Sequence, residues 1–343
     1  MINKEYFTEA SIAKFVEFSK TIYGDDDLVT NENFVRNKHL ENPDGESLYL
    51  EFKTGELVTG RLAVQFRKAA EQSKLQVLKN PVDLISIGRH PFGGLNLYKE
   101  AIALELSMNR RGTYHTSNPK SEIFYRRILK EEPLAELGYK FLLFSISSTS
   151  FYSFFINPVL TIIRVFVEKI LELLALASNL KSSSISESTE SQMESLFSDE
   201  DKLVLYRDAK RLSWRFPEVE GFPEYQKIEF YKGDDFCGYL VFRRIQSHGY
   251  AALLIVDFYT SNLNHFDKAK IYRRLISASQ GMNMILIIAN FSNKKIRRQF
   301  DLPFLLLPNR MVPQKFPIYS PAIDRVNNLD KFSYLTLFDL DIL

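Results

Sequence analysis

The chain of 343 residues is 45% hydrophobic and 25% charged, which excludes general disorder and allows one large domain or two medium ones. Its 44 Lys and Arg against 42 Asp and Glu leave a formal charge of +2, so bulk charge favours neither nucleic acid nor anionic lipid as a partner. A single cysteine, Cys237, excludes an internal disulfide, and with an N-terminus that lacks a signal-peptide pattern it predicts a reducing, cytoplasmic setting.

A ten-residue stretch near the start of the chain recurs in its second half. "EFKTGELVTG" at residues 51–60 returns as "EFYKGDDFCG" at residues 229–238. The shared positions are Glu51, Phe52, Gly55 and Gly60 in the first copy and Glu229, Phe230, Gly233 and Gly238 in the second. Each copy predicts a β-hairpin whose first glycine supplies a positive φ in the turn. The second glycine, inside a strand, indicates a bulge or the close approach of another backbone.

Strand and helix signals alternate after the first hairpin. The run "VDLISI" at 82–87 predicts a strand, the loop "GRHPFGG" follows at 88–94, and "LNLYKEAIALELSMN" at 95–109 predicts a helix. The next predicted strand is "GTYHT" at 112–116. This order indicates mixed α/β structure.

The stretch 141–163 carries no charge and is long enough to cross a bilayer, but Ser, Thr and Pro158 interrupt it. We predict a buried strand there, followed by an amphipathic helix over 158–180. That helix is expected to pack against its own domains, and docking on a membrane surface is the alternative. The segment 181–201 is rich in Ser and Glu and predicts a flexible linker.

The second half repeats the order of the first. Its hairpin precedes a predicted strand at 251–260, a helix at 265–281 and a strand at 282–290. Because hairpin, strand and helix recur on both sides of the linker, we predict a duplicated domain. The predicted parts are an N-terminal domain at 1–156, a connecting helix and linker at 157–201, and a C-terminal domain at 202–343.

The residues after the strand at 112–116 resemble a known family. In "NPKSEIFY", Asn118, Ser121 and Tyr125 resemble the Asn, small residue and Tyr, spaced three and seven residues along, that follow the fifth strand of GNAT-type N-acetyltransferases. "ELGYKF" at 136–141 is similar to the Leu-Gly-Phe that usually comes next, here delayed by an insertion.

The second half resembles the same element in "NKKIRRQFDLPF" at 293–304, with Asn293 kept and Phe300 in place of Tyr. The resemblance implies an α/β fold of two GNAT-like mixed-sheet domains in tandem. Three further motifs resemble the subset found with bacterial surface-polysaccharide genes, and FemAB-like aminoacyltransferases are relatives with paired domains. These motifs are "HLENPDG" at 39–45, "LSWRFPEVEGFPEY" at 212–225 and "YLTLFDLDI" at 334–342.

The resemblance implies a site for acyl-CoA between the fourth and fifth strands of a domain. The pantetheine arm would lie between the splayed strands, and the pyrophosphate would lie on the N-terminus of the following helix. Arg89, Gly93 and Gly94 offer a cation and N–H groups there, although their spacing departs from the family pattern and also suits a plain helix start. Since the second half has no glycine at this place, the first half is the expected CoA site.

The resemblance also names catalytic candidates. Tyr125 would protonate the departing CoA thiolate, or pack its ring against the sheet. Asn118 would orient the cofactor or cap a helix. His90 and His115 fall near the ends of the fourth and fifth strands and would receive the amine proton, or are surface or packed histidines. Asp257 is either an acceptor-binding carboxylate or a buried structural one. If the amine loses its proton to water, none of these side chains is needed as a base.

We therefore predict an N-acyltransferase that moves an acyl group from acetyl-CoA or another acyl-CoA to a small-molecule amine. The expected acceptor is a nucleotide- or lipid-linked amino sugar in surface-polysaccharide assembly. The alternatives are FemAB-like aminoacyl transfer and a non-catalytic module that binds a ligand or partner. Five histidines and one cysteine give no zinc spacing, and the short basic runs are expected to be solvated helix faces, without a nucleic-acid partner.

Overall fold

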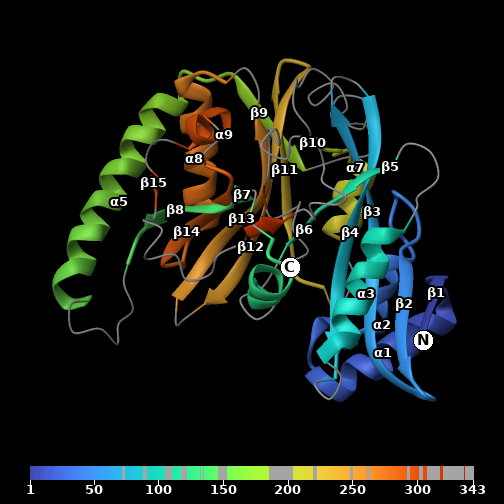
Figure 1. Ribbon diagram of the computed structural model, residues 1–343. Coiled ribbons are helices and arrows are strands. Elements are labelled where there is room, and N and C mark those ends of the chain that lie inside the picture. Colours follow the sequence, from blue (N-terminus) through green and yellow to red (C-terminus); the bar gives the residue numbers. More distant parts are fainter. Residues whose placement is uncertain are drawn as a thin grey trace. The chain divides into compact units, whose positions relative to one another are not determined.

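A computed structural model shows the chain as two compact units, each built from segments of both halves (Figure 1). Unit 1 comprises Met1–Glu136, Phe197–Phe222 and Phe316–Ser333, and unit 2 comprises the rest. The structure describes residues 1–71, 74–87, 91–104, 110–116, 122–131, 133, 135–145, 153–184, 204–218, 222–247, 250–260, 263–291, 294–300, 304–306, 317–319 and 336.

Unit 1 is built on a mixed sheet. Its elements are β1 Ile2–Tyr6, α1 Glu9–Tyr23, the 3₁₀ turn η1 Leu28–Thr30, α2 Glu32–His39, β2 Leu48–Thr54, β3 Leu57–Glu71, β4 Lys74–Ser86, α3 Pro91–Ala103, β5 Arg110–Thr113, β6 His115–Thr116, the π-helical turn η2 Phe124–Ile128, β7 Ala135–Glu136, β10 Val204–Leu205, α7 Ala209–Arg215 and β16 Pro317–Tyr319. The main sheet has the order β1-β2-β3-β4-β5, with β10 paired to β3, and a small sheet has the order β6-β16-β7. Only β4 and β5 run parallel in the main sheet.

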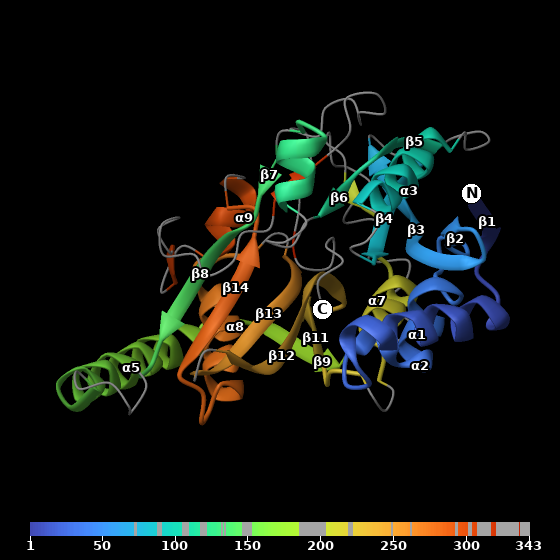
Figure 2. The same cartoon turned by 60° about the horizontal axis from the view of Figure 1, so that its bottom comes forward.

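The strands of this sheet bury both faces, because successive side chains point to opposite sides. One face packs against α1 and α2 in a core that includes Phe15, Phe34 and Val82. The other packs against α3 in a core that includes Leu62 and Leu97. Figure 2 shows α1 and α2 on the side of the sheet away from α3. Unit 1 is therefore a three-layer arrangement of helices, sheet and helix.

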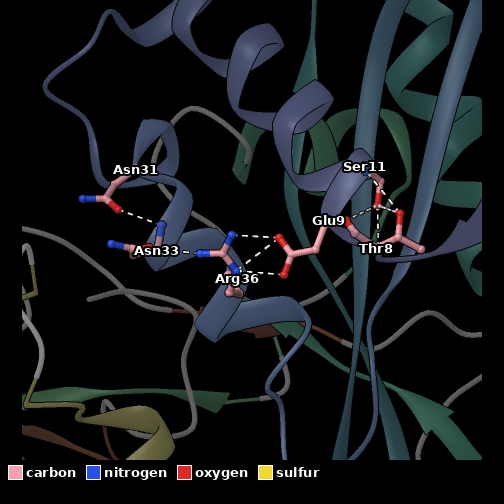
Figure 3. Close-up of polar contacts among 6 residues, drawn as sticks. All are labelled: Thr8, Glu9, Ser11, Asn31, Asn33 and Arg36. Atoms are coloured by element: carbon pink, nitrogen blue, oxygen red, sulfur yellow. Dashed lines mark hydrogen bonds and ion pairs between the residues drawn. The ribbon is translucent and has the colours of Figure 1, made fainter.

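The first two helices begin at side-chain caps (Figure 3). Thr8 and Ser11 form a capping box at the start of α1, and Asn31 caps α2. Arg36 Nη2 lies 2.7 Å from Glu9 Oε2 and so joins α2 to the first turn of α1. Short polar residues ahead of each apolar run thus fix where both helices start.

Unit 2 is built on a seven-stranded sheet. Its elements are β8 Gly138–Leu143, α5 Ser153–Ala175, β9 Leu180–Ser184, β11 Gln226–Lys232, β12 Asp235–Ser247, β13 Tyr250–Thr260, α8 His265–Ala278, β14 Met284–Ala289, α9 Lys294–Gln299 and β15 Leu305–Leu306. The strand order is β15-β8-β14-β13-β12-β11-β9, with β13 and β14 parallel. α5 packs along α8. The predicted mixed α/β fold is confirmed in both units.

Each unit contains a strand from the opposite half of the chain. β8 follows the helical turn η2 of the first half, yet it pairs with β14 in unit 2, joining Gly138 to Ala289. β16 follows the corresponding element of the second half, yet it pairs with β6 in unit 1, joining Tyr319 to His115. The two halves have therefore exchanged equivalent strands.

This exchange corrects the predicted organisation of the chain. The contiguous domains expected at 1–156 and 202–343 do not match the two units, because the chain from Leu137 joins unit 2. Helix α5, expected as a connector, is part of unit 2. The expected linker begins within strand β9, which pairs with β11, and its residues 185–201 lie outside the described residues. In the described chain, no helix combines the length and the apolarity needed to cross a membrane.

Both copies of the repeated stretch form hairpins with the same irregularity. Gly55 and Gly233 take φ values of +64° and +62° in their turns. In each hairpin the register shifts by one residue directly after the shared phenylalanine. The residues opposed at this shift are Phe52 and Gly60 in the first hairpin and Phe230 and Gly238 in the second. The bulge predicted beside the second glycine is confirmed in both copies.

Two of the motifs that resemble a polysaccharide-associated subset each bond to a residue just ahead of the other motif inside unit 1. Asp44 of "HLENPDG" accepts a hydrogen bond from Arg211 Nε at 2.8 Å and another from the Lys68 N–H at 2.9 Å. Trp214 Nε1 donates to the carbonyl of Asn37 at 2.6 Å. These contacts hold α7 against α2 and the sheet, so both motifs have a structural role.

Candidate active site

The parallel strands β4 and β5 of unit 1 stay paired over only a few residues. Their last register pair joins Lys79 to Thr113, and the N–H of Tyr114 donates to the Lys79 carbonyl at 3.0 Å. The chain then continues as β6 and pairs with β16 instead. Residues 80–86 of β4 pair with β3 on one side, and no strand of the described residues pairs with them on the other. The gap between β4 and β5 can therefore receive an extended ligand along the free edge of β4.

A buried polar cluster lies where β5 gives way to β6. Tyr98 Oη is 3.0 Å from His115 Nδ1 and 3.2 Å from Glu131 Oε1. The Tyr125 and His115 ring centroids are 4.1 Å apart, and Tyr319 stacks on the same imidazole at 5.5 Å. We call these five residues the tyrosine–histidine cluster. Each of the five side chains is at least nine-tenths buried.

Burial sets the protonation of this cluster. It lowers the pKa of His115 to about 3, so the imidazole is neutral near pH 7. It raises the pKa of Glu131 to about 7, although the hydrogen bond from Tyr98 acts in the opposite direction. The 3.4 Å contact of His115 Nε2 with Glu131 Oε2 therefore joins groups that are not both charged. Burial and Glu131 also raise the pKa of Tyr125, which keeps its phenol protonated.

Glu131→Gln is expected to flatten the pH dependence of the free energy of unfolding. A carboxyl whose folded pKa is raised contributes stability that is full below pH 4.5 and is lost as the pH rises through 7. Gln mimics the protonated form at both pH values. Between pH 5 and pH 8, the free energy of unfolding measured in urea should therefore fall on the order of 1–2 kcal/mol more in wild type than in the variant. Glu56→Gln, at an exposed turn, should leave the difference unchanged. Parallel pH curves for wild type and Glu131→Gln would contradict the assigned burial.

Helix α3 starts close beyond β4 and carries two of the predicted cofactor residues in its first turn. A Cβ at Gly93 would lie 3.1 Å from the Phe52 ring, and one at Gly94 would lie 3.7 Å from Ser86 Cβ. Both glycines therefore let α3 approach the sheet closely, which is a packing role. No acidic residue lies in this first turn, where helix N–H groups lack intrahelical partners. The helix end is thus suited to an anion.

Three predicted site residues lie outside the described residues, namely Arg89, His90 and Asn118. Of the others, the structure brings Tyr125 and His115 together, with Gly93 and Gly94 on α3. It does not place Asp257 with them, since that residue belongs to unit 2. Among the described residues, no group of three His, Cys, Asp or Glu side chains could hold a metal ion.

The corresponding gap of unit 2 is occupied by its own chain. β13 and β14 pair from Ala252 to Ile255. Beyond this, Thr336 forms a bridge with Ala289, and its hydroxyl donates to Asp257 Oδ1 at 2.5 Å. Thr336 is fully buried. A ligand lying between β13 and β14 would therefore have to displace a residue of the protein.

Two polar members of the cluster have no polar or no titratable equivalent at the corresponding positions of unit 2. Sequence spacing gives the correspondences Tyr98 with Tyr272, His115 with Asn290, and Tyr125 with Phe300. The Tyr272 and Phe300 rings are 6.2 Å apart, so the aromatic contact is kept. The imidazole and one phenol are lost, and with them the groups that could transfer a proton.

The N-terminus of α8, the counterpart of α3, is closed by its own side chains. Asn264 Oδ1 accepts from the Asp267 N–H at 2.9 Å, and Asp267 Oδ2 accepts from the Asn264 N–H at 3.0 Å. Burial would raise the pKa of Asp267, but Lys232 and the Asn264 N–H outweigh it and hold the pKa below its ordinary value. A negative charge thus lies where a phosphate would bind. Unit 1 is the better equipped of the two.

Both units place a buried aspartate at a bulge of the fourth strand. Asp257 is fully buried and accepts from the Tyr239 hydroxyl at 2.8 Å, a contact internal to unit 2. Asp83, which the sequence did not single out, lies at the matching register shift of β4 with φ +53°. Its carboxylate is 2.8 Å from Lys38 Nζ and 2.9 Å from His39 Nε2. The duplication therefore extends to a pair of buried acids.

No known family model matches the chain, and no curated protein matches it. Solved structures do. A GCN5-related N-acetyltransferase from Anabaena variabilis is 9% identical, with a TM-score of 0.62, over 93% of this chain and 72% of that one. A probable N-acyltransferase of unknown function from Enterococcus faecalis is 12% identical, with a TM-score of 0.63, over the same shares. This chain has a GNAT-like fold.

N-myristoyltransferase of Saccharomyces cerevisiae, solved with bound myristoyl-CoA, is another structural neighbour. It is 11% identical, with a TM-score of 0.53, over 97% of this chain and 83% of that one. The whole two-unit chain therefore aligns with the neighbours, and the predicted tandem GNAT-like fold is confirmed. At these identities the likeness concerns the fold alone.

Proposed function

We propose that the protein transfers an acyl group from acyl-CoA to an amine, and that unit 1 carries the reaction. The observation that carries the proposal is the difference between the units. In unit 1 no strand of the described residues pairs with residues 80–86 of β4 on the β5 side, and Tyr125 lies against His115, which follows β5. In unit 2 Thr336 forms a bridge with β14, and Phe300 replaces the phenol. The GNAT-like fold and the acyltransferase names of the structural neighbours support this assignment.

The acyl-CoA would bind along unit 1 in three parts. The pantetheine arm would pair with the free edge of β4 at residues 80–86, as an added strand does. The pyrophosphate would lie at the N-terminus of α3, where N–H groups and the helix dipole favour an anion. The thioester would then lie near the tyrosine–histidine cluster.

The reaction forms one C–N bond and breaks one C–S bond. The amine nitrogen attacks the thioester carbonyl, and the amine proton passes to Glu131, whose pKa of about 7 suits a base near neutral pH. The Tyr125 phenol donates its proton to the departing CoA thiolate. Glu131 then returns its proton to Tyr125, which restores both groups. The His115 imidazole contacts both side chains. Tyr98 holds Glu131 and His115 in place.

The acceptor that we propose is an amino sugar in surface-polysaccharide assembly, and the proposed compartment of the reaction is the cytoplasm. The support for this substrate is the motif resemblance at 39–45, 212–225 and 334–342, and the support for the compartment is the lone Cys237. Unit 2 would perform no chemistry, which keeps part of the non-catalytic alternative.

Titration calorimetry of the full chain with acetyl-CoA and with CoA tests the proposal. Asn96→Asp adds a charge on the exposed side of α3 and should weaken binding about three- to tenfold, whereas Asn33→Asp on α2 should not. Gly94 is unsuited to this test because its side chain would point at Ser86 and Leu84. Tyr125→Phe should keep binding and lower turnover of an amine acceptor about 100-fold. No binding at millimolar nucleotide, or equal weakening by both charges, would refute the site.

A further inference from the structure

Helix α5 carries most of the exposed apolar surface of the described chain. Of the 20 large hydrophobic side chains that are exposed, 12 lie between residues 154 and 176. On α5 and the residue after it they are Phe154, Phe155, Ile156, Val159, Ile162, Ile163, Val165, Phe166, Ile170, Leu173, Leu174 and Leu176. Exposed apolar residues scattered singly need no explanation, but a contiguous patch marks an interaction site.

The helix turns the ion pair of Arg164 and Glu168 towards the rest of unit 2 and most of its large apolar side chains outward. Its packed stripe runs through Leu160, Arg164, Glu168 and Leu171, which are buried or half-buried. Arg164 Nε lies 2.8 Å from Glu168 Oε1, and its guanidinium lies 4.4 Å from the Phe144 ring. A surface helix of a globular protein normally shows the opposite pattern. The outward face of α5 is therefore built to meet an apolar medium. Figure 1 shows α5 along the outer side of α8.

A basic flank borders this apolar face. Together α5 and α8 carry six Lys and Arg against three carboxylates, one of which is the buried Asp267. Arg273 of α8 is 3.6 Å from Glu172 of α5, and Lys270 Nζ donates to the carbonyl of Ser178 just beyond α5. Lys169, on α5 itself, is 2.9 Å from the same Glu172. Lys169, Lys270 and Arg273 thus lie beside the apolar strip.

We propose that α5 lies flat on an anionic lipid bilayer, with its outward face in the acyl-chain boundary and the basic flank on the headgroups. Apolar burial and attraction to anionic lipid together hold amphipathic helices at such an interface. The four charged side chains of α5 suit a helix lying on the surface rather than crossing it. This inference does not depend on the proposed acyl transfer.

A second copy of the chain is a poorer occupant of the face. The 23 residues of α5 make a strip about 34 Å long and about 10 Å across, on the order of 350 Å². A standard interface buries about 800 Å² per partner, so α5 alone is too small for a stable dimer. Pairing two copies through this strip would also bring two basic flanks together, which is unfavourable.

Sedimentation of the full chain with vesicles tests the proposal without any acyl-CoA. The vesicles contain phosphatidylcholine alone, or three parts of it with one part phosphatidylglycerol. Binding is expected to the anionic vesicles and to weaken as salt rises from about 0.05 to about 0.5 M. Ile162→Glu with Phe166→Glu should weaken binding at least about tenfold. Arg273→Gln with Arg274→Gln should weaken it about five- to tenfold, because each basic residue adds to attraction near the surface.

Leu57→Glu with Leu75→Glu is the matched control. These two side chains are 65% and 57% exposed in unit 1, against 71% and 65% for Ile162 and Phe166. The control adds the same charge and should leave vesicle binding unchanged. The proposal is overturned if the chain does not associate with vesicles at millimolar lipid. It is equally overturned if Ile162→Glu with Phe166→Glu weakens vesicle binding no more than Leu57→Glu with Leu75→Glu does. It is also overturned by a dimer, seen in sedimentation equilibrium, that Ile162→Glu with Phe166→Glu dissociates.

Discussion

Gly238→Ala is expected to destabilise the protein by more than about 3 kcal/mol. Gly238 takes a φ of +144°, and a Cβ built there would lie 2.0 Å from the Tyr259 carbonyl oxygen and 2.8 Å from Thr260 Cα. Both contacts are with backbone of the neighbouring strand, so β12 and β13 would have to separate. Chemical unfolding followed by circular dichroism measures the loss.

Gly233→Ala, in the turn of the same hairpin, separates conformational strain from this clash. Gly233 has a φ of +62°, and no heavy atom lies within 4 Å of its built Cβ. Its substitution should therefore cost only the left-handed penalty of about 1–2 kcal/mol. Gly60→Ala should cost less than Gly238→Ala, because its Cβ would meet the end of a flexible Leu97 side chain at 3.0 Å instead of backbone. Equal losses of stability at Gly233 and Gly238 would show that the close approach of β12 and β13 is not the reason why position 238 requires glycine.

Asp83→Asn is expected to cost about 3 kcal/mol, because it leaves the buried Lys38 ammonium facing a neutral amide. The Asp83 carboxylate contacts both Lys38 and His39, and all three side chains are buried. Asn keeps the size of the side chain and tolerates the φ of +53° at this position, so the change isolates the charge. Urea unfolding at pH 7 gives the value directly.

The pH dependence of this loss has a defined sign. Burial alone would raise the pKa of Asp83, but Lys38 and His39 outweigh it and hold the pKa well below its ordinary value. A lowered carboxyl pKa stabilises the fold above pH 3.8, and that contribution is lost as the pH falls further. The gap between wild type and Asp83→Asn should therefore shrink in acid. Asp25→Asn, in an exposed pair with Lys20, should change stability by less than about 0.5 kcal/mol.

Local signals predicted the elements well. Glycine spacing located both hairpins and their bulges, and apolar periodicity predicted a helix over 265–281, where α8 spans His265–Ala278. The helix expected from residue 95 instead starts at Pro91, because proline suits the first turn. Two glycines then continue the helix, since Gly93 packs on Phe52. A Gly-rich stretch predicts a loop as long as the side chain that packs against it is unknown.

The site could be predicted only in part. The family resemblance named Tyr125 and His115, which lie together in the structure, but not Tyr98, Glu131 and Tyr319 of the same cluster. Tyr319 reaches His115 on an exchanged strand from about 200 residues away, and no local pattern reports such a pairing. Glu131 lies in what was read as an insertion, and only burial reveals its raised pKa. The inward charges of α5 were likewise invisible to periodicity alone.

The exchange of β8 and β16 determines how the chain can fold. Cutting the chain in the Ser- and Glu-rich segment at 185–200 would leave each half without a strand that its sheet requires and with an unpaired edge. Neither fragment should fold alone, whereas the two mixed together should complement one another. Because each unit contains segments from both halves of the chain, neither unit can complete its sheet until both halves have been made.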